Sequence, residues 1–323
     1  MQVTKRMLPL YQKSSQRRDN FIIHARQKET LENNLSRIAF LSPSCGSSCT
    51  YTASSEVLTF SGTGSMYDYS TSNTAPWYAE ERNTTKSIII TDGITHIGSY
   101  SFYYFTNATS ITIPDSVTSI GAGAFYFCSS LKSLTIPNSV KSIPNDFCRQ
   151  CSSLESFVIP EGVTSVGKDA FSSCFNLKSV TIPDSVKTFA DYAFYACYQL
   201  ESVNIPEGVT TISSGMFRSC YNLTSITIPS TVRTVNARAF ADCTGLKEVT
   251  YLGTSNPTFT NNIFSNSQIE HVYVTPEYKD STFCGMPVVV FGLKTPTSLF
   301  TNSKVFTKSD IFTSTKGFTK SDI

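Results

Sequence analysis

Apolar and polar positions between residues 88 and 274 recur at a fixed interval of 23 residues. A repeat length between ~20 and 50 residues is typical of solenoids, in which each unit buries its apolar side chains against its neighbours. The pattern therefore predicts a stack of similar units. One proline and one cysteine mark the interval in six consecutive units: Pro114, Pro137, Pro160, Pro183, Pro206 and Pro229, with Cys128, Cys151, Cys174, Cys197, Cys220 and Cys243.

Each unit contains two extended segments and a return. An alternating triplet that ends at the proline, as in residues 134–137, predicts a short strand with one buried face. Proline cannot donate a hydrogen bond to a sheet, so it closes that strand. The spacing of Val140 and Ile143 predicts a second extended or turning segment. The run from Ala170 to Cys174 predicts a single turn of α- or 3₁₀-helix that returns the chain.

This unit predicts nine strand registers along the chain. At the ~4.8 Å spacing of neighbouring strands, nine rungs would form a stack about 40 Å long. The registers are residues 88–90, 111–113, 134–136, 157–159, 180–182, 203–205, 226–228, 249–251 and 272–274.

The unit also resembles a known repeat. The run from Ile120 to Leu131, I-G-A-G-A-F-Y-F-C-S-S-L, is similar to the I-G-x-x-A-F-x-x-C-x-x-L unit of BspA-like leucine-rich repeat proteins, a surface-antigen family of bacteria and anaerobic protists. The resemblance covers residues 43–292. It implies a β-rich, α/β-type leucine-rich-repeat solenoid of about nine 23-residue rungs, with a cap at each end. It also implies a non-enzymatic adhesin or antigen, on the cell surface or secreted, and it names no ligand.

The chain divides into five segments. The solenoid needs a cover at each end, because an open edge would pair with other chains. In the N-terminal cap, residues 57–66 alternate and then turn on glycines, which predicts a β-hairpin, and Trp77 is expected in the core of this cap rather than on a ligand platform. The segments are a basic N-terminal tail (1–42), an N-terminal cap (43–86), the solenoid (87–274), a C-terminal cap (275–294) and a tail (295–323).

Both tails differ from the solenoid in composition. The first 40 residues carry eight Lys or Arg and three Asp or Glu, and residues 29–41 could form a short amphipathic helix. In the C-terminal tail the hexapeptide F-T-K-S-D-I occurs at 306–311 and again at 318–323. One aromatic residue in six cannot build a core, so this tail is expected to be disordered. The C-terminal cap is expected to end in a strand at 288–291.

Ten cysteines raise the question of disulfides. The six repeated cysteines are expected to be free, buried thiols that act as small apolar side chains, and Phe105 takes their register in an earlier rung. The alternative is bridging between rungs, because stacked strands bring thiols near bonding distance. For Cys45 and Cys49 the alternatives are a disulfide in an oxidising compartment or two free thiols.

Charge and hydropathy bear on partners and location. The formal net charge of +2 does not favour nucleic acid. No apolar run follows Lys5 and Arg6, so no secretory signal is expected. No stretch approaches the ~20 apolar residues of a transmembrane helix. The family resemblance favours the cell surface or secretion, whereas the missing signal favours a cytoplasmic location.

The sequence offers little catalytic chemistry. His24, His96 and His271 lie in the N-terminal tail, the first rung and the last rung, so no Ser–His–Asp or Cys–His site is expected. The cysteine spacing lacks the paired arrangement of a zinc ribbon, and no nucleotide-binding or metalloprotease motif occurs. We therefore expect no enzyme, no cofactor and no metal site.

Two surfaces are candidates for binding a protein or a glycan. The first is the outward face of the strands, rich in hydroxyl groups, which is either a solvated sheet with cross-strand pairs or an adhesive face. Its candidate residues are Ser179, Thr181, Ser202, Asn204, Ser225 and Thr227. The second is the position after the repeated cysteine, which holds Phe175, Tyr198 and Tyr221 in three successive rungs, with Tyr195 on the same turn. These rings either form a partner-binding ridge or pack on one another between rungs.

Three asparagines fit the N-glycosylation triplet, and they matter only if the protein enters a secretory route. They are Asn83, Asn107 and Asn222. Three functions remain open: a surface or secreted binding module for host protein, matrix or another cell, an intracellular interaction scaffold that uses the same face, and a coat component without a specific ligand.

Overall fold

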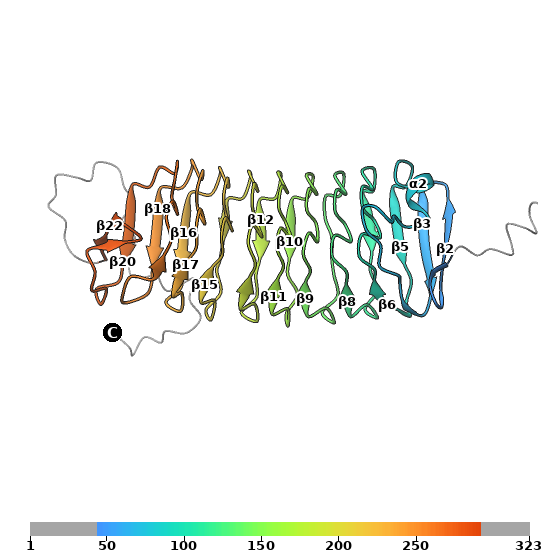
Figure 1. The fold of residues 1–323 in the computed structure, drawn as a ribbon, viewed down its shortest axis with the longest axis horizontal. Coiled ribbons are helices and arrows are strands. Elements are labelled where there is room, and N and C mark those ends of the chain that lie inside the picture. The colour runs from blue at the N-terminus through green and yellow to red at the C-terminus, as the bar shows by residue number, and fades with distance from the viewer. Residues whose placement is uncertain (1–43, 292–323) are drawn as a thin grey trace, which may run out of the picture.

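The computed structural model describes residues 44–291, which wind into one elongated stack of similar turns (Figure 1). The strands that come first in the chain lie at one end of the stack and the last strands at the other. The predicted tails at 1–42 and 295–323, the helix expected within 29–41 and the last three residues of the predicted C-terminal cap lie outside the described residues. The solenoid predicted from the 23-residue period is confirmed.

One side of the stack carries the strands that precede the prolines. Eight of the nine predicted registers form strands, and each pairs in parallel with the position 23 residues along, as Ser156 does with Ser179. The strands are β5 (Ser87–Ile90), β7 (Ser110–Thr112), β10 (Ser156–Val158), β12 (Ser179–Thr181), β14 (Ser202–Val203), β16 (Ser225–Ile228), β18 (Glu248–Tyr251) and β20 (His271–Val274).

The strand predicted at residues 134–136 was wrong. No strand forms there, and this side divides into three sheets, with the orders β1-β2-β3-β5-β7, β10-β12-β14 and β16-β18-β20-β23. Leu134 and Ile136 are nevertheless buried. Side-chain burial thus keeps this rung in register where ladder hydrogen bonds do not.

The second side of the stack consists of shorter strands, so the segment after each proline is extended. These strands again pair in parallel, in three sheets of three strands each. They are β4 (Gly64–Ser65), β6 (Ile94–Ile97), β8 (Ser119–Ile120), β9 (Ser142–Ile143), β11 (Ser165–Val166), β13 (Thr188–Phe189), β15 (Thr211–Ile212), β17 (Thr234–Val235) and β19 (Thr258–Phe259).

The third side is built from turns, and the helical turn predicted for residues 170–174 was wrong. Two residues in this segment have positive φ, Asp169 at 54° and Ser173 at 61°. Between them, the Phe171 N–H donates to the Ala193 carbonyl of the next rung at 2.9 Å. In a helix these N–H groups would bond within their own segment. Here the alternating backbone handedness directs them along the stack, which joins neighbouring rungs. We call this side the turn side.

A column of phenylalanine rings fills the centre of the stack. Phe171, Phe194 and Phe217 stack with ring centroids 5.5 and 5.6 Å apart and interplanar angles of 6° and 5°. One rung differs, because Cys148 occupies the ring register and Phe147 fills the space from the preceding position, at 73° to Phe171. A buried aromatic side chain contributes more apolar area than any other residue type, so this column is the main source of stacking energy.

The repeated cysteines are free and buried, as predicted. Each thiol lies within hydrogen-bond distance of a backbone carbonyl, as Cys197 Sγ donates to the Phe171 oxygen at 3.3 Å. Burial raises the pKa of the Cys197 and Cys220 thiols well above the usual value. These side chains are therefore neutral core groups rather than reactive thiols.

The N-terminal end begins with β1 (Ser44–Gly46) and an antiparallel hairpin of β2 (Cys49–Ser54) and β3 (Val57–Gly62). The hairpin predicted over residues 57–66 was wrong, because the turn lies at Ser55 and Glu56, both with positive φ. Gly62 and Gly64, with φ of 120° and 79°, instead form the corner between β3 and β4.

Trp77 lies in the core beneath this hairpin, as expected, beside the short helix α2 (Tyr78–Glu81). Its ring packs edge-on against Phe60 at 4.7 Å, and its Nε1–H donates to the Ser101 carbonyl at 2.8 Å. Cys45 and Cys49 form a disulfide, with Cα atoms 5.1 Å apart, which settles the alternative that the sequence left open.

The C-terminal end contains the hairpin of β21 (Thr282–Phe283) and β22 (Met286–Pro287). It is followed by β23 (Val289–Val290), which pairs in parallel with β20. The final strand predicted at 288–291 is therefore present, shortened to two residues.

Candidate binding surfaces

The hydroxyl-rich strand face is flat, regular and exposed. In β12 the Ser179 and Thr181 side chains point outward, while Val180 between them is buried. The other candidates on this face, Ser202, Asn204, Ser225 and Thr227, are exposed as well. One cross-strand hydroxyl pair occurs nearby, from Ser110 to Ser87 at 3.1 Å. This geometry fits a solvated sheet, and an adhesive role for the face stays a prediction.

The rings that follow the repeated cysteines form a continuous stack on the turn side. The centroid of Tyr198 lies 4.8 Å from that of Phe175 and 4.7 Å from that of Tyr221, with interplanar angles of 14° and 15°. Tyr221 is 41% exposed, and Phe175 and Tyr198 are half-buried. The rings thus pack on one another and still reach the surface, so the two alternatives drawn from the sequence are not exclusive. We call these three rings the aromatic column.

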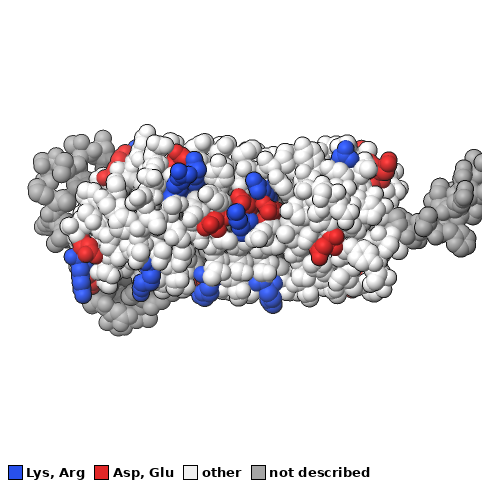
Figure 2. All heavy atoms as spheres, viewed as in Figure 1, with Lys and Arg blue, Asp and Glu red and all other residues white. Residues whose placement is uncertain are grey.

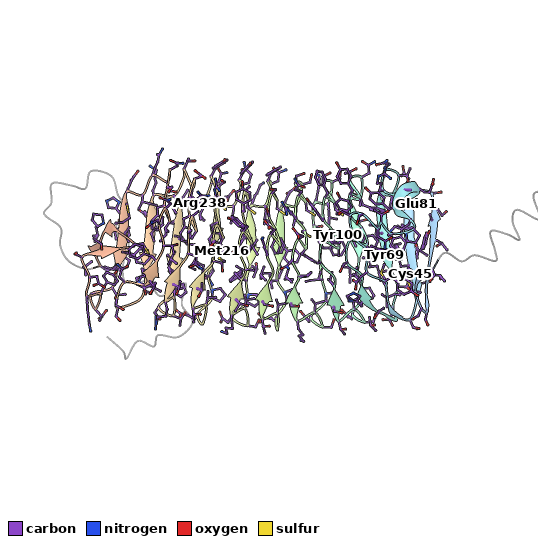
Figure 3. All side chains as sticks on the ribbon, viewed as in Figure 1. Cys45, Tyr69, Glu81, Tyr100, Met216 and Arg238 are labelled. Atoms are coloured by element: carbon purple, nitrogen blue, oxygen red, sulfur yellow. A yellow bond between two sulfur atoms is a disulfide. The ribbon has the colours of Figure 1, made fainter. Side chains whose placement is uncertain are left out.

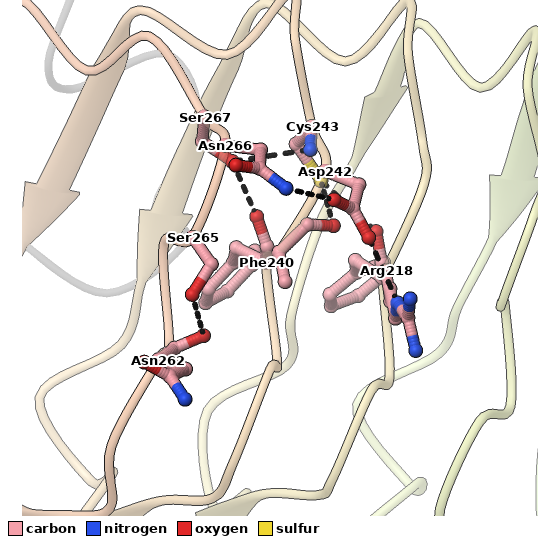
Figure 4. Close-up of polar contacts among 10 residues, drawn as sticks. Arg218, Phe240, Asp242, Cys243, Asn262, Ser265, Asn266 and Ser267 are labelled. Atoms are coloured by element: carbon pink, nitrogen blue, oxygen red, sulfur yellow. Dashed lines mark hydrogen bonds and ion pairs between the residues drawn. The ribbon is translucent and has the colours of Figure 1, made fainter.

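Tyr195 lies on the same side and is held by a chain of polar contacts. The Arg218 guanidinium lies 5.7 Å from the centre of the Tyr195 ring, and its Nε donates to Asp242 at 2.9 Å. Asn266 donates to the other oxygen of Asp242 at 2.7 Å (Figure 4). Hydrogen bonds from Asn266 and Arg218 lower the pKa of the Asp242 carboxyl. Arg218 is therefore fixed between a ring and a carboxylate.

A larger group of rings lies nearer the N-terminus, and the sequence did not single it out as a site. Tyr103 is at its centre, with its centroid 5.9 Å from Tyr78, 5.5 Å from Tyr104 and 5.3 Å from Tyr126. We define the tyrosine cluster as the six rings of Tyr78, Tyr100, Tyr103, Tyr104, Tyr126 and Phe127. The crowding of tyrosines at 100–104 is visible in the sequence, but Tyr78 and Tyr126 join them only because rungs stack.

The structure also corrects the expectation that no Ser–His–Asp group would assemble. His96 Nδ1 lies 2.7 Å from Ser119 Oγ, and His96 Nε2 lies 3.6 Å from Asp68 Oδ1. The second distance exceeds a hydrogen bond, and Asp68 instead accepts the Ser99 N–H at 2.7 Å. The Asp68 side chain is 68% exposed. Without a hydrogen bond to orient the imidazole, this group lacks the arrangement of a catalytic triad.

The three glycosylation candidates are exposed. Asn107 Nδ2 donates to the Asn83 carbonyl at 2.6 Å, and Asn222 Nδ2 donates to Gln199 Oε1 at 2.8 Å. Modification at these positions stays a prediction. Within residues 44–291 there is no helix of the length and apolarity that a membrane span requires. The same residues contain no group of three His, Cys, Asp or Glu side chains placed to hold a metal.

Comparison with solved structures gives three similar proteins. A leucine rich cell surface protein from Faecalibacterium prausnitzii A2-165 is 21% identical, with 72% of this chain and 88% of that chain covered and a TM-score of 0.47. A leucine-rich repeat protein from Bacteroides ovatus is 20% identical, with 73% and 78% covered and a TM-score of 0.46. A leucine-rich repeat protein from T. pallidum is 22% identical, with 65% and 82% covered and a TM-score of 0.42.

Curated proteins gave no match to this chain. The family model described as the BspA type leucine rich repeat region does match, with six copies over residues 78–201 and 164–285. The two matches together span more than half of the 323 residues.

Proposed function

Because the chain belongs to the BspA-type leucine-rich repeat family, we propose that it is a non-enzymatic binding module that acts on the cell surface or after secretion. Its ligand would be a host protein, a matrix component or another cell. The aromatic column is the observation that carries this proposal. Three rings stacked less than 5 Å apart present their edges at the surface of a regular scaffold.

Preorganisation explains why such a column suits binding. Tyrosine supplies contact area with few rotatable bonds, and it is enriched among the residues that dominate binding energies. The Tyr198 ring is held between Phe175 and Tyr221, so little side-chain entropy remains to be lost when a partner docks. A ligand would meet this surface in nearly its final form.

The disulfide supports a location outside the reducing cytosol. A bond between Cys45 and Cys49 persists in oxidising compartments and is rare where glutathione keeps thiols reduced. The repeated thiols do not conflict with this, because they are buried and hydrogen-bonded to backbone carbonyls.

Protease shaving of intact, unpermeabilised cells tests the location. Cleavage of the chain under conditions that leave a cytosolic marker intact is the expected result. Protection of the chain, while a known surface protein is cut, would contradict a surface role and would favour an intracellular scaffold. A secreted protein would instead be found in the culture medium.

Adhesion assays test the binding role itself. Cells that carry Tyr198→Ala with Tyr221→Ala should attach to immobilised host matrix at least about tenfold less, since ~1.4 kcal/mol of lost contact energy corresponds to a factor of ten. The matched control is Ser179→Ala with Ser202→Ala on the strand face. Unchanged adhesion in the tyrosine variant would remove the aromatic column as the binding surface.

A further inference from the structure

The tyrosine cluster is the largest group of surface aromatic rings in the described part of the chain. Tyr103 is sandwiched between Tyr78, at an interplanar angle of 5°, and Tyr126, at 50°. Tyr104 is 38% exposed and stacks on Phe127 at 4.4 Å. Five of its six rings belong to tyrosine, so the cluster combines a continuous apolar surface with a group of phenolic hydroxyls.

Arginine side chains complete the rim of the cluster. The guanidinium of Arg149 lies 5.5 Å from the centre of the Tyr126 ring, and that of Arg82 lies 4.6 Å from the centre of the Tyr78 ring. Arg149 also pairs with Asp146 at 3.1 Å. Tyrosine with arginine is the combination that dominates protein–protein contacts.

Local charge favours a neutral partner. Figure 2 shows this side of the solenoid as mostly uncharged, with acidic and basic side chains gathered in small mixed groups. At the rim of the cluster, Arg149 lies 3.1 Å from Asp146 and 3.9 Å from Asp169. A polyanion such as nucleic acid or a sulfated glycan would meet these carboxylates, so it does not fit this surface.

The orientation of the rings favours protein over a neutral glycan. Sugars bind aromatic side chains chiefly by placing their C–H face on an open ring face. In the cluster, the ring faces of Tyr103 and Tyr104 are turned toward neighbouring rings. Ring edges and hydroxyl groups remain at the surface. Hydrogen bonds from tyrosine hydroxyls within residues 44–291 are made by Tyr251 and Tyr278, which lie elsewhere. The hydroxyls of the cluster are free to donate to backbone carbonyls of a ligand.

We propose that the tyrosine cluster is a second protein-binding site on this solenoid, which takes an uncharged, apolar peptide segment of a partner protein. The proposal rests on the binding function above, and it adds a site separate from the aromatic column. Both surfaces lie on the turn side, and Tyr103 and Tyr195 share one register four rungs apart, or about 19 Å at the strand spacing. Figure 3 marks this side by Tyr100 and Arg238, which also share a register.

Selection from a random peptide library displayed on phage tests the site, with the full chain as bait. Each enriched peptide is then synthesised, and its affinity for the wild type and for three variants is measured by fluorescence polarisation. The cluster variant is Tyr103→Ala with Tyr126→Ala, and the column variant is Tyr198→Ala with Tyr221→Ala. The control variant is Ser179→Ala with Ser202→Ala.

At least one enriched, uncharged peptide should bind the cluster variant about 30-fold more weakly or worse, as expected for loss of dominant contacts. The same peptide should bind the column and control variants as it binds the wild type. A second cluster variant, Tyr104→Asn, guards against misfolding, because asparagine tolerates the positive φ of 66° at this position. It should weaken the same peptide about fivefold and leave the circular dichroism spectrum unchanged.

Three outcomes would overturn the proposal. If every enriched peptide depends on Tyr198 and Tyr221 alone, the aromatic column binds protein but the cluster does not, and the function proposed above still stands. If no peptide is enriched, the cluster is not a peptide site. If a panel of neutral oligosaccharides binds the wild type and not the cluster variant, the ligand is a glycan rather than a protein.

Discussion

Gly123 tests how the turn side is held together. This residue has a φ of 61°, and a Cβ atom placed on it would lie 2.5 Å from Cε1 of Tyr100 in the preceding rung. Two separate costs therefore follow from Gly123→Ala. Left-handed backbone costs a non-glycine residue about 1–2 kcal/mol. Displacing a half-buried, packed ring adds about 1–2 kcal/mol more, within the usual range for overpacking.

We expect Gly123→Ala to lower the free energy of unfolding by about 2–4 kcal/mol, measured by urea denaturation with circular dichroism. Gly64→Ala is the matched control, because Gly64 has a φ of 79° and no atom within 4 Å of its Cβ position. The control should lose about 1–2 kcal/mol, from backbone handedness alone. Tyr100→Ser should remove the excess cost of Gly123→Ala in a double-mutant cycle.

Equal losses in Gly123→Ala and Gly64→Ala would refute the role of the ring, and so would a loss from Gly123→Ala that Tyr100→Ser does not relieve. The same arrangement occurs a second time in the chain, where the Tyr192 ring lies over Gly215, with a φ of 59°. Gly215→Ala should therefore behave like Gly123→Ala. A difference between the two sites would mean that the effect depends on the rung rather than on the ring and the glycine.

Three further predictions concern sulfur chemistry and the histidine group. Burial raises the thiol pKa of Cys197 and Cys220 in the folded state, so above the unfolded thiol pKa of about 8.5 the unfolded state binds fewer protons and stability should fall as pH rises; Cys197→Ala should flatten the slope of unfolding free energy against pH, and an unchanged slope would contradict this. Reduction of the Cys45–Cys49 disulfide should lower stability by about 2 kcal/mol, the value for a very short loop, in thermal unfolding with and without dithiothreitol, and an unchanged midpoint would mean that the end of the stack frays independently of the rest. Finally, any release of nitrophenol from nitrophenyl acetate should be unaffected by Ser119→Ala, because the His96 imidazole has no orienting hydrogen bond from a carboxylate; a loss of rate would make this group a catalytic site.

The sequence predicted the stack, its period and most of its strands, because residues that share a register in a solenoid meet the same neighbours in every rung. Val180 alternates with exposed Ser179 and Thr181 as the pattern required, and Cys197 is a buried free thiol. These properties depend on interactions within a unit or between identical positions of adjacent units, which a repeating pattern reveals directly.

The errors arose where backbone geometry rather than apolar pattern decides. The segment of Ala170–Cys174 has a helix-like spacing of apolar residues, yet its amides bond to the next rung because Asp169 and Ser173 adopt positive φ. Nothing in these two residue types requires that conformation. The tyrosine cluster was missed for a different reason, since Tyr78, Tyr103 and Tyr126 become neighbours only when rungs of unequal sequence are stacked.

The uniform rung height also limits how such a surface can change over generations. Because each rung repeats after 23 residues and pairs in parallel with the next, duplication or loss of one unit between Tyr104 and Phe175 would leave every ring in both sites in its own local setting. It would change only the distance between the two sites, in steps of about 4.8 Å. Unequal recombination among near-identical repeats would therefore act as a ruler, adjusting the reach of a two-site protein without redesigning either site.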